Sequence, residues 1–327
     1  MKYIDTHCDT LMGSFFDPQG FDLLNNPKTM VDFTRMKQGG AMAQFFAMFL
    51  LPPGAEKMMN LDKPVDDEDY IMKLSSALKR NVEANSDIIA MAHNADELLA
   101  NDKAGKMSAF LTIEDGRSVN GSFENLQRYY DMGVRLISLT WNFKNCFGSP
   151  NSKDPVMMAE GLTDFGKEAV VWMQEKGMLV DVSHLSDGGF MDVAKLAKVP
   201  FIASHSNCRA LSPHQRNLTD EMIKILADKG GVSGINFGPE FLNADVTCKD
   251  STNELIVKHI KHFINVGGTD CVGLGSDFDG IGGNLEVGSS DKVPMIWDLL
   301  HKEGISDDVI EKIAWKNHFR VIKEAMK

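Results

Sequence analysis

Histidines and carboxylates recur at the ends of apolar, strand-like segments in this sequence. The chain begins MKYIDTHCDT, where an apolar, β-prone start gives way to His7 and Asp9. Residues two apart on a strand project from the same face, so these two side chains are expected to point the same way. Later segments end in the same residue types: Glu114 in SAFLTIE, His184 in MLVDVSH, His205 in PFIASH and Asp277 in CVGLGSD. This recurrence is hard to obtain from structural needs alone.

These residue types favour a metal site with hydrolytic chemistry. Imidazole and carboxylate together suit a borderline divalent cation such as zinc, whereas oxygen ligands alone would suit magnesium or calcium. The inventory is sufficient for two Zn²⁺ per chain, and Glu114 is the natural bridge between ions about 3.5–4 Å apart. Such a pair lowers the pKa of a trapped water towards 7 and polarises a carbonyl group. Asp277 would then remain free to transfer protons.

Eight strand-like segments must position these residues. Helical periodicity separates most of them, and Ser122, Thr163, Ser186 and Thr219 precede helices as N-cap residues. The alternation predicts an α/β fold, a (β/α)8 TIM barrel, although a doubly wound sheet shows the same pattern with fewer strands. In a barrel the carboxyl ends of the strands form the active-site face, where distant residues converge. The predicted strands are 3–9, 42–49, 108–114, 134–141, 178–184, 200–205, 231–237 and 271–277.

Two regions depart from a regular barrel. Residues 50–107 form an insertion after the second strand, with a charged helix from about Asp66 to Glu83, and residues 291–327 add helices after the last strand. The length of 327 residues permits one barrel, so we predict a single hydrolase domain over 1–327. The remaining histidines fall in helices or loops and are expected at the surface: His93, His214, His259, His262, His301 and His318.

Composition excludes several classes of partner. The formal net charge of −12 provides no basic stripe for a phosphate backbone, so nucleic acid is not expected. No apolar run approaches the ~20 residues of a membrane span, and the first residues lack the pattern of a secretion signal. The 5 cysteines are widely spaced without a CxxC, which is typical of reduced thiols. We therefore predict a cytoplasmic protein without a membrane partner.

The sequence resembles the membrane (renal) dipeptidase family, a branch of the amidohydrolase-like barrels. Five stretches carry the resemblance in family order over residues 1 to about 285: THCDT, IEDG, VDVSHLS, ASHSNCRALSPHQRN and GLGSDFDG. The resemblance implies a zinc-dependent dipeptidase that hydrolyses free dipeptides through a metal-bridging hydroxide. It assigns His7 and Asp9 to one zinc ion, His184 and His205 to the other, and the bridge to Glu114. It also implies proton transfer by Asp277, and a family tendency to dimerise is consistent with a homodimer.

The resemblance also bears on substrate binding. Arg216 in HQRN matches the arginine that in this family grips the substrate carboxylate, a task that suits a planar guanidinium. One position departs from the family, because animal members carry a histidine after Leu-Thr on the fourth strand, where Trp141 stands here. Trp141 cannot supply the same donor and acceptor atoms, so Asn142 or Asn145 is a candidate donor to substrate.

Two alternatives remain open. A different amidohydrolase-type enzyme could act on a lactone or cyclic amide with the same metal site, but such relatives usually begin His-x-His and often use a modified lysine as bridge. A catalytically silent metal-binding protein is the other alternative, and the presence of Asp277 speaks against it.

Overall fold

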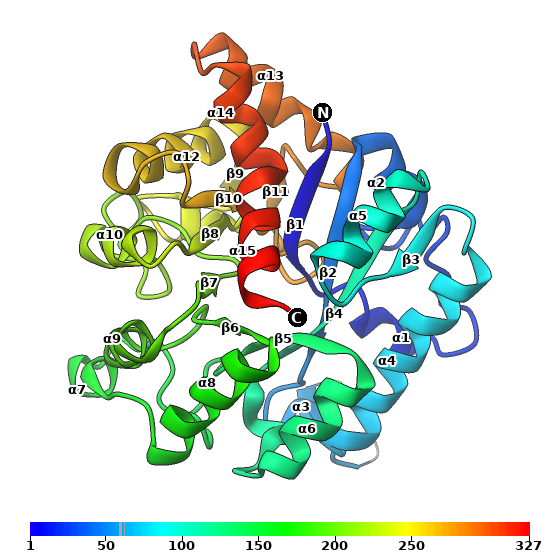
Figure 1. The fold of residues 1–327 in the computed structure, drawn as a ribbon, viewed down its shortest axis with the longest axis vertical. Helices are drawn as coiled ribbons and strands as arrows, with labels where there is room; N and C mark the ends of the chain where they lie inside the picture. Colours follow the sequence, from blue (N-terminus) through cyan, green and yellow to red (C-terminus); the bar gives the residue numbers. More distant parts are fainter. Residues whose placement is uncertain (59–60, 62) are drawn as a thin grey trace.

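Parallel strands close into a barrel in the computed structural model, which describes residues 1–58, 61 and 63–327 (Figure 1). The sheet has 9 strands in the order β2-β1-β10-β8-β7-β6-β5-β4-β3, and pairing of β2 with β4 closes the ring. The TIM barrel predicted from the sequence is therefore confirmed. The barrel strands are β1 (Tyr3–Cys8), β2 (Ala41–Phe49), β4 (Met107–Glu114), β5 (Val134–Ser138), β6 (Leu179–Asp181), β7 (Ile202–Ala203), β8 (Val232–Ile235) and β10 (Val272–Leu274).

The insertion after β2 contains more structure than the sequence indicated. The charged helix is present as α4 (Asp67–Ala84), capped by Asp66. The strand β3 (Ile89–Met91) and the helix α5 (Ala95–Lys103) were not predicted. β3 pairs in parallel with the first residues of β4 and lies outside the closed ring. A run of 3 strand residues is too short to show a period of its own.

Helices surround the barrel and connect its strands (Figure 1). The four N-cap residues named from the sequence all accept a hydrogen bond from the first turn of their helix. The remaining helices are α1 (Met12–Phe16), α2 (Phe33–Gly39), α3 (Ala55–Met58), α6 (Phe123–Met132), α7 (Pro155–Ala159), α8 (Asp164–Lys176), α9 (Asp187–Leu196), α10 (Asp220–Asp228), α11 (Pro239–Leu242), α12 (Asn253–Gly267), α13 (Pro294–Lys302), α14 (Asp307–Glu311) and α15 (Asn317–Ala325). Short elements complete the chain: 3₁₀ turns η1 (Gly116–Val119) and η2 (Ser290–Lys292), the π-helical turn η3 (Lys312–Lys316), and a parallel pair β9 (Asp250–Ser251) and β11 (Asn284–Leu285).

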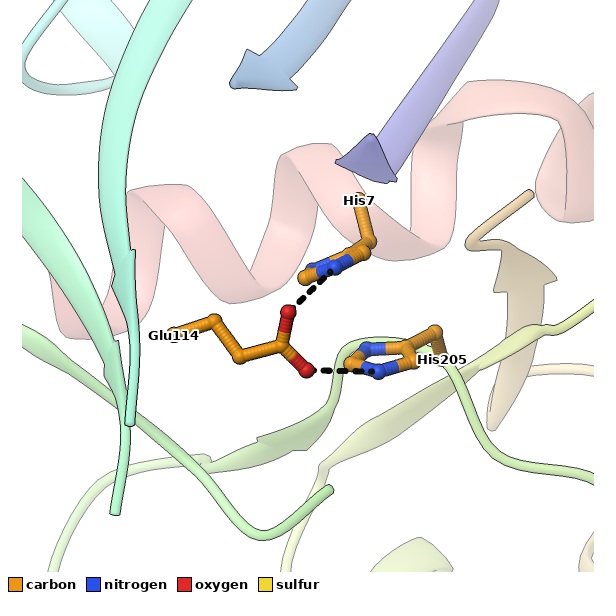
Figure 2. A group of neighbouring side chains, drawn as sticks. All are labelled: His7, Glu114 and His205. Carbon is orange, nitrogen blue, oxygen red and sulfur yellow. Dashed lines mark ion pairs between the residues drawn. The ribbon is translucent and has the colours of Figure 1, made fainter. Parts of the chain in front are cut away.

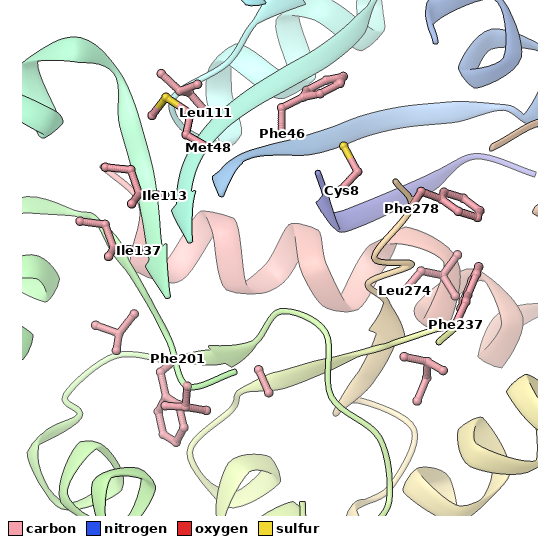
Figure 3. Close-up of a cluster of buried hydrophobic side chains, with 14 of the residues drawn as sticks. Cys8, Phe46, Met48, Leu111, Ile113, Ile137, Phe201, Phe237, Leu274 and Phe278 are labelled. Atoms are coloured by element: carbon pink, nitrogen blue, oxygen red, sulfur yellow. The ribbon is translucent and has the colours of Figure 1, made fainter. Parts of the chain in front are cut away.

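Apolar side chains pack on both sides of the barrel wall. Phe46 and Met48 of β2 belong to the large cluster between strands and helices (Figure 3), whereas Ala43 and Phe45 belong to a second cluster. This alternation is the period of two expected of a strand. The second cluster joins residues from the starts of the strands to Val321 and other apolar residues of α15. The helix α15 thus covers the amino end of the barrel and leaves the carboxyl end for the polar residues.

The prediction that the other histidines lie at the surface is wrong for His259 and His318, which are fully buried. The ring of His259 accepts a hydrogen bond from the Cys208 amide and bonds the Leu242 carbonyl, and His318 bonds the Leu274 carbonyl. Backbone partners satisfy these rings, so helix packing can bury them.

All five cysteines are free thiols, as predicted. No helix in the described part of the chain has both the length and the apolar character that crossing a membrane requires.

Candidate metal centre

Six polar residues named from the sequence meet at the carboxyl end of the barrel and are buried: His7, Asp9, Glu114, His184, His205 and Asp277. His7 lies within β1 and Glu114 is the last residue of β4. The others lie in loops directly after their strands, so the prediction that they end the strands themselves is wrong: Asp9, His184, His205 and Asp277. Strands β6, β7 and β10 are shorter than predicted, and the chain leaves the sheet before it reaches His184, His205 and Asp277.

Glu114 lies between imidazole rings from two sides of the barrel (Figure 2). Its Oε2 lies 3.2 Å from His7 Nε2, and its Oε1 lies 2.9 Å from His184 Nε2 and 3.4 Å from His205 Nε2. The two carboxylate oxygens therefore face two different sets of nitrogen atoms. The Nε2 atoms of His184 and His205 are 3.1 Å apart, so both can face one point.

A second group of donors surrounds the same His7 ring. His7 Nε2 lies 3.5 Å from Asp9 Oδ1 and 3.8 Å from Asp277 Oδ1, which confirms that the first pair points the same way. Ligand atoms of these three residues lie within 4.8 Å of one another, as do those of His7, Glu114 and His205. Among the described residues, His7 Nε2 and Asp9 Oδ1 are buried without a hydrogen-bond partner. Buried nitrogen and oxygen atoms that lack hydrogen-bond partners and can offer a lone pair fit a site built for cations.

Hydrogen bonds at the far ring nitrogens orient two of the histidines. His184 Nδ1 lies 3.2 Å from Asn142 Oδ1, which can only accept, so Nδ1 carries the proton and Nε2 is left as a free ligand. His205 Nδ1 lies 2.7 Å from Ser204 Oγ, whose hydroxyl donates to Asp181 Oδ2 at 2.6 Å. Chains of hydrogen bonds from an imidazole to a carboxylate are typical of metal sites, because they fix the tautomer and the orientation of the ring.

The backbone around the site adopts conformations that most residues avoid. His184 (φ 68°), Asp277 (φ 62°) and Asp279 (φ 68°) all lie in the left-handed region. Residues held there cost of order 1–3 kcal/mol each and cluster at functional sites. At Gly280 a Cβ atom would lie 2.2 Å from Asp9 Oδ2 and 2.6 Å from Asp277 Oδ1, so this position needs glycine for close approach.

Burial and neighbouring charges shift the titration of the site. The pKa of Glu114 is raised to about 7 and that of Asp277 to about 8. Burial is the largest cause of both shifts, His7 opposes them, and the nearby Asp9 carboxylate adds to them. Burial lowers the pKa of His7, but Glu114 and Asp9 outweigh it and raise this pKa well above its usual value. Burial and nearby positive groups hold the pKa values of His184 and His205 well below the usual value. Those two rings are therefore neutral in the metal-free site, whereas His7 must release a proton when a metal ion binds.

The proposed substrate-binding residues differ in their surroundings. Arg216 is buried and donates from Nη1 to Ser206 Oγ (2.7 Å) and from Nη2 to the His205 carbonyl (2.9 Å). Its Nε has no partner among the described residues. Asn142 is exposed, and within the described chain its amide nitrogen makes no hydrogen bond. Asn145 instead donates to Asp115 and to the Leu139 carbonyl, which makes it a structural residue.

A cavity of about 260 Å³ opens over these groups. Polar residues of the site form its floor, and apolar side chains form much of its wall. Trp141 is part of that wall, with its ring 6.1 Å from the ring of His184. The lining consists of Asp9, Met12, Phe49, Glu114, Trp141, Asn142, His184, Glu240, Phe241, Asp277, Asp279, Gly280 and Ile281. The volume lies just below the ~300–1,000 Å³ of pockets for drug-sized ligands, so it suits a small substrate.

Sequence reasoning missed the residues that support the site. Asp181 and Ser204 orient His205, and Asn236 Nδ2 donates to Asp277 Oδ2 at 2.7 Å. Asp181 was visible within VDVSH, and Asn236 stands near the end of a predicted strand. The available signal for these supporting residues was thus their position near the carboxyl end of a strand. Their hydrogen-bond partners could not be identified because they are distant in sequence.

Together, a TIM barrel and a buried set of histidines and carboxylates at its carboxyl end define the class of metal-dependent barrel hydrolases. Comparison with known proteins identifies the family. The family model described as membrane dipeptidase (peptidase family M19) matches residues 1–327, and the chain belongs to this family. It is accordingly a metallo-dipeptidase, a hydrolase acting on peptide bonds.

The chain is also similar to individual proteins. The chain is 31% identical to dipeptidase tcpJ of Claviceps purpurea over 328 residues, which cover 98% of this chain and 76% of that protein. It is 37% identical over 270 residues to an uncharacterized Klebsiella pneumoniae protein from the pqqA 5′ region, covering 80% of this chain and 97% of that protein. A Rhodobacter sphaeroides metallopeptidase, solved with a phosphinate mimic of the dipeptide L-Ala-D-Ala, has the same fold (TM-score 0.89, 24% identity, 99% of each chain).

Proposed function

We propose that this chain is a zinc-dependent dipeptidase whose site holds two zinc ions, with Glu114 between them. The observation that carries the proposal is the position of the Glu114 carboxylate, whose two oxygens face His7 on one side and the pair His184 and His205 on the other. Asp9 completes the first half of the site. When bound, the two ions would lower the pKa of a trapped water towards neutrality and polarise the scissile carbonyl.

Asp277 is the residue we assign to proton transfer. Asn236 holds its Oδ2, which leaves Oδ1 directed towards His7 and the cavity. Burial already favours the protonated form of this carboxyl group, so it can deliver a proton to the leaving amine. The group must accept that proton earlier in the cycle from the attacking water.

Asn142 and Arg216 are the residues we assign to substrate binding. The Oδ1 atom of Asn142 faces His184, so its free amide nitrogen can donate to a substrate oxygen in the cavity. The guanidinium of Arg216 retains donor positions beyond its two hydrogen bonds and lies 5.8 Å from the ring centre of Phe241, a cavity residue. We propose that it binds the terminal carboxylate of the dipeptide.

Metal analysis tests the dinuclear proposal. Zinc reconstitution of chelator-treated protein should restore two ions per chain, and an anomalous-scattering map should place them on either side of Glu114. Ions absent from His7, Asp9, Glu114, His184 and His205 would contradict the proposal. One ion per chain at full activity would contradict the assigned role of the bridge.

A substrate panel tests the reaction. Free dipeptides should be hydrolysed, and lactones and cyclic amides should not. Turnover of a lactone in preference to any dipeptide would favour the alternative amidohydrolase function. Full zinc occupancy without turnover of any compound would favour a silent metal-binding protein.

A further inference from the structure

Glu240 contributes a carboxylate to the cavity that neither the metal donors nor the fold uses. It lies in the short helix α11, directly after β8, and its side chain is partly exposed. It lines the same cavity as the metal donors. Within the described part of the chain, its carboxylate makes no hydrogen bond or ion pair, and only its backbone carbonyl accepts one, from Ser212. Its carboxylate is therefore left unpaired by the described residues, in a residue that borders the cavity.

The other acidic residues of the cavity already have partners. Asp9, Glu114 and Asp277 belong to the cluster around His7. Asp279 accepts hydrogen bonds from Thr10 Oγ1 (2.5 Å) and from the Met30 amide (2.7 Å). Glu240 is thus the cavity carboxylate that has no assigned task in binding metal or holding the backbone.

The surroundings of Glu240 suit a long side chain with a positive end. Apolar wall residues can cover an aliphatic stem, namely Met12, Phe49, Trp141, Phe241 and Ile281. Lysine and arginine side chains bury such stems while their charged ends seek a polar partner. None of the described residues that line the cavity is a lysine or arginine, so no cation in this lining competes for the Glu240 carboxylate. An aromatic wall adds attraction for a cation.

We propose that Glu240 makes this enzyme selective for dipeptides that carry a cationic side chain, of the lysine or arginine type. The inference rests on the proposed function, because it concerns the substrate of the same site. A carboxylate at the end of an apolar wall is the arrangement by which hydrolase pockets select basic residues. If Glu240 instead held the α-ammonium group, it would affect every dipeptide equally.

Matched substrates separate these two roles. Ala-Lys and Ala-norleucine have the same side-chain carbon skeleton and differ in the terminal ammonium group, as do Lys-Ala and norleucine-Ala. The ratio of kcat/KM for lysine over norleucine in each pair measures side-chain charge recognition, because the α-ammonium group is present in both members. The wild-type enzyme should favour lysine at least tenfold in one of the two pairs.

Glu240→Gln should reduce that ratio at least fivefold, mainly through a higher KM for the lysine substrate. Glu254→Gln is the matched control, because it makes the same change in net charge on an exposed position of α12 outside the cavity. The control should keep the wild-type ratio. A ratio that is unchanged in Glu240→Gln overturns the proposal, as does an equal loss on both members of each pair.

Charge reversal gives a second readout that a purely structural role would not produce. Glu240→Lys should reverse the preference at the position where the wild type favours lysine, so that Ala-Glu is cleaved better than Ala-Gln, or Glu-Ala better than Gln-Ala. Continued preference for lysine at that position in this variant would overturn the proposal. Failure of the wild type on all four lysine and norleucine dipeptides would overturn the dipeptidase function itself, whereas good cleavage without lysine preference would overturn only the role of Glu240.

Discussion

The two ends of the barrel are equally buried but chemically opposite. At the carboxyl end, Glu114 is 2% exposed and sits among histidines and other carboxylates. At the amino end, Ile322 of α15 is 1% exposed and packs in an apolar cluster with the first residues of the strands. Apolar burial stabilises the fold without any ligand, whereas a buried polar cluster is stabilised only when its charges are paired or bound to metal. One end therefore holds the barrel together, and the other carries its chemistry.

The largest effect should come from removing the proton carrier at the carboxyl end. Asp277→Asn should lower kcat on a free dipeptide by about 10²–10⁴-fold, since a positioned acid or base contributes that much. Metal content should stay near wild type, because Asp277 is assigned to proton transfer. Steady-state rates and metal analysis on one preparation check both points. A variant that is inactive because it has lost metal would make Asp277 a ligand instead.

Arg216→Ala should have the next largest effect. It should cut kcat/KM on a free dipeptide by roughly two orders of magnitude, taking a charge-assisted contact at about 3 kcal/mol. It should also nearly erase the preference for the free acid over the C-terminal amide. Four rates decide the matter: both proteins on a dipeptide and on its amide. If the variant keeps its preference for the free acid, Arg216 is not the carboxylate anchor.

A change at the amino end should affect stability and leave catalysis alone. Ile322→Ala should lower the free energy of unfolding by about 2 kcal/mol, the low end for such substitutions. Denaturant titration measures this, and kcat on a dipeptide should match wild type below the unfolding transition. Lys323→Ala is the exposed control on the same helix and should change stability little. Loss of kcat in Ile322→Ala would show that the two ends are coupled.

The smallest expected effect is on how the stability of the metal-free protein depends on pH. Folded Asp277 keeps its proton up to about pH 8, whereas an unfolded aspartate loses it near pH 4. The folded state thus binds more protons in this window, and stability is lost as pH rises towards 8. Asparagine cannot titrate, so metal-free Asp277→Asn should lose less stability than wild type between pH 5 and 8, by about 1 kcal/mol or more. Identical slopes in denaturant titrations of the two metal-free proteins would contradict this.

Local patterns in the sequence predicted the barrel and the candidate metal ligands at one face of it. Apolar, strand-like runs marked the eight barrel strands, and side-chain caps such as Ser122 and Thr163 marked helix starts, because both signals act within a few residues. His7, Asp9 and Glu114 could be named because strand ends and barrel topology constrain where polar residues meet. The short strand β3 escaped because three residues carry too little pattern.

Tertiary structure alone decided which atoms meet. Hydrogen bonds link Asp181 through Ser204 to His205, and the two Glu114 oxygens face His7 and His184. Both arrangements depend on contacts between residues far apart in sequence. Burial of His259 follows from the packing of its helix, whereas the sequence prediction placed this histidine at the surface. Backbone hydrogen bonding and apolar alternation act over short distances and can be read along the chain. The direction in which a side chain points across a closed barrel depends on all the strands that lie between it and its partner. This direction is therefore set only in the folded protein.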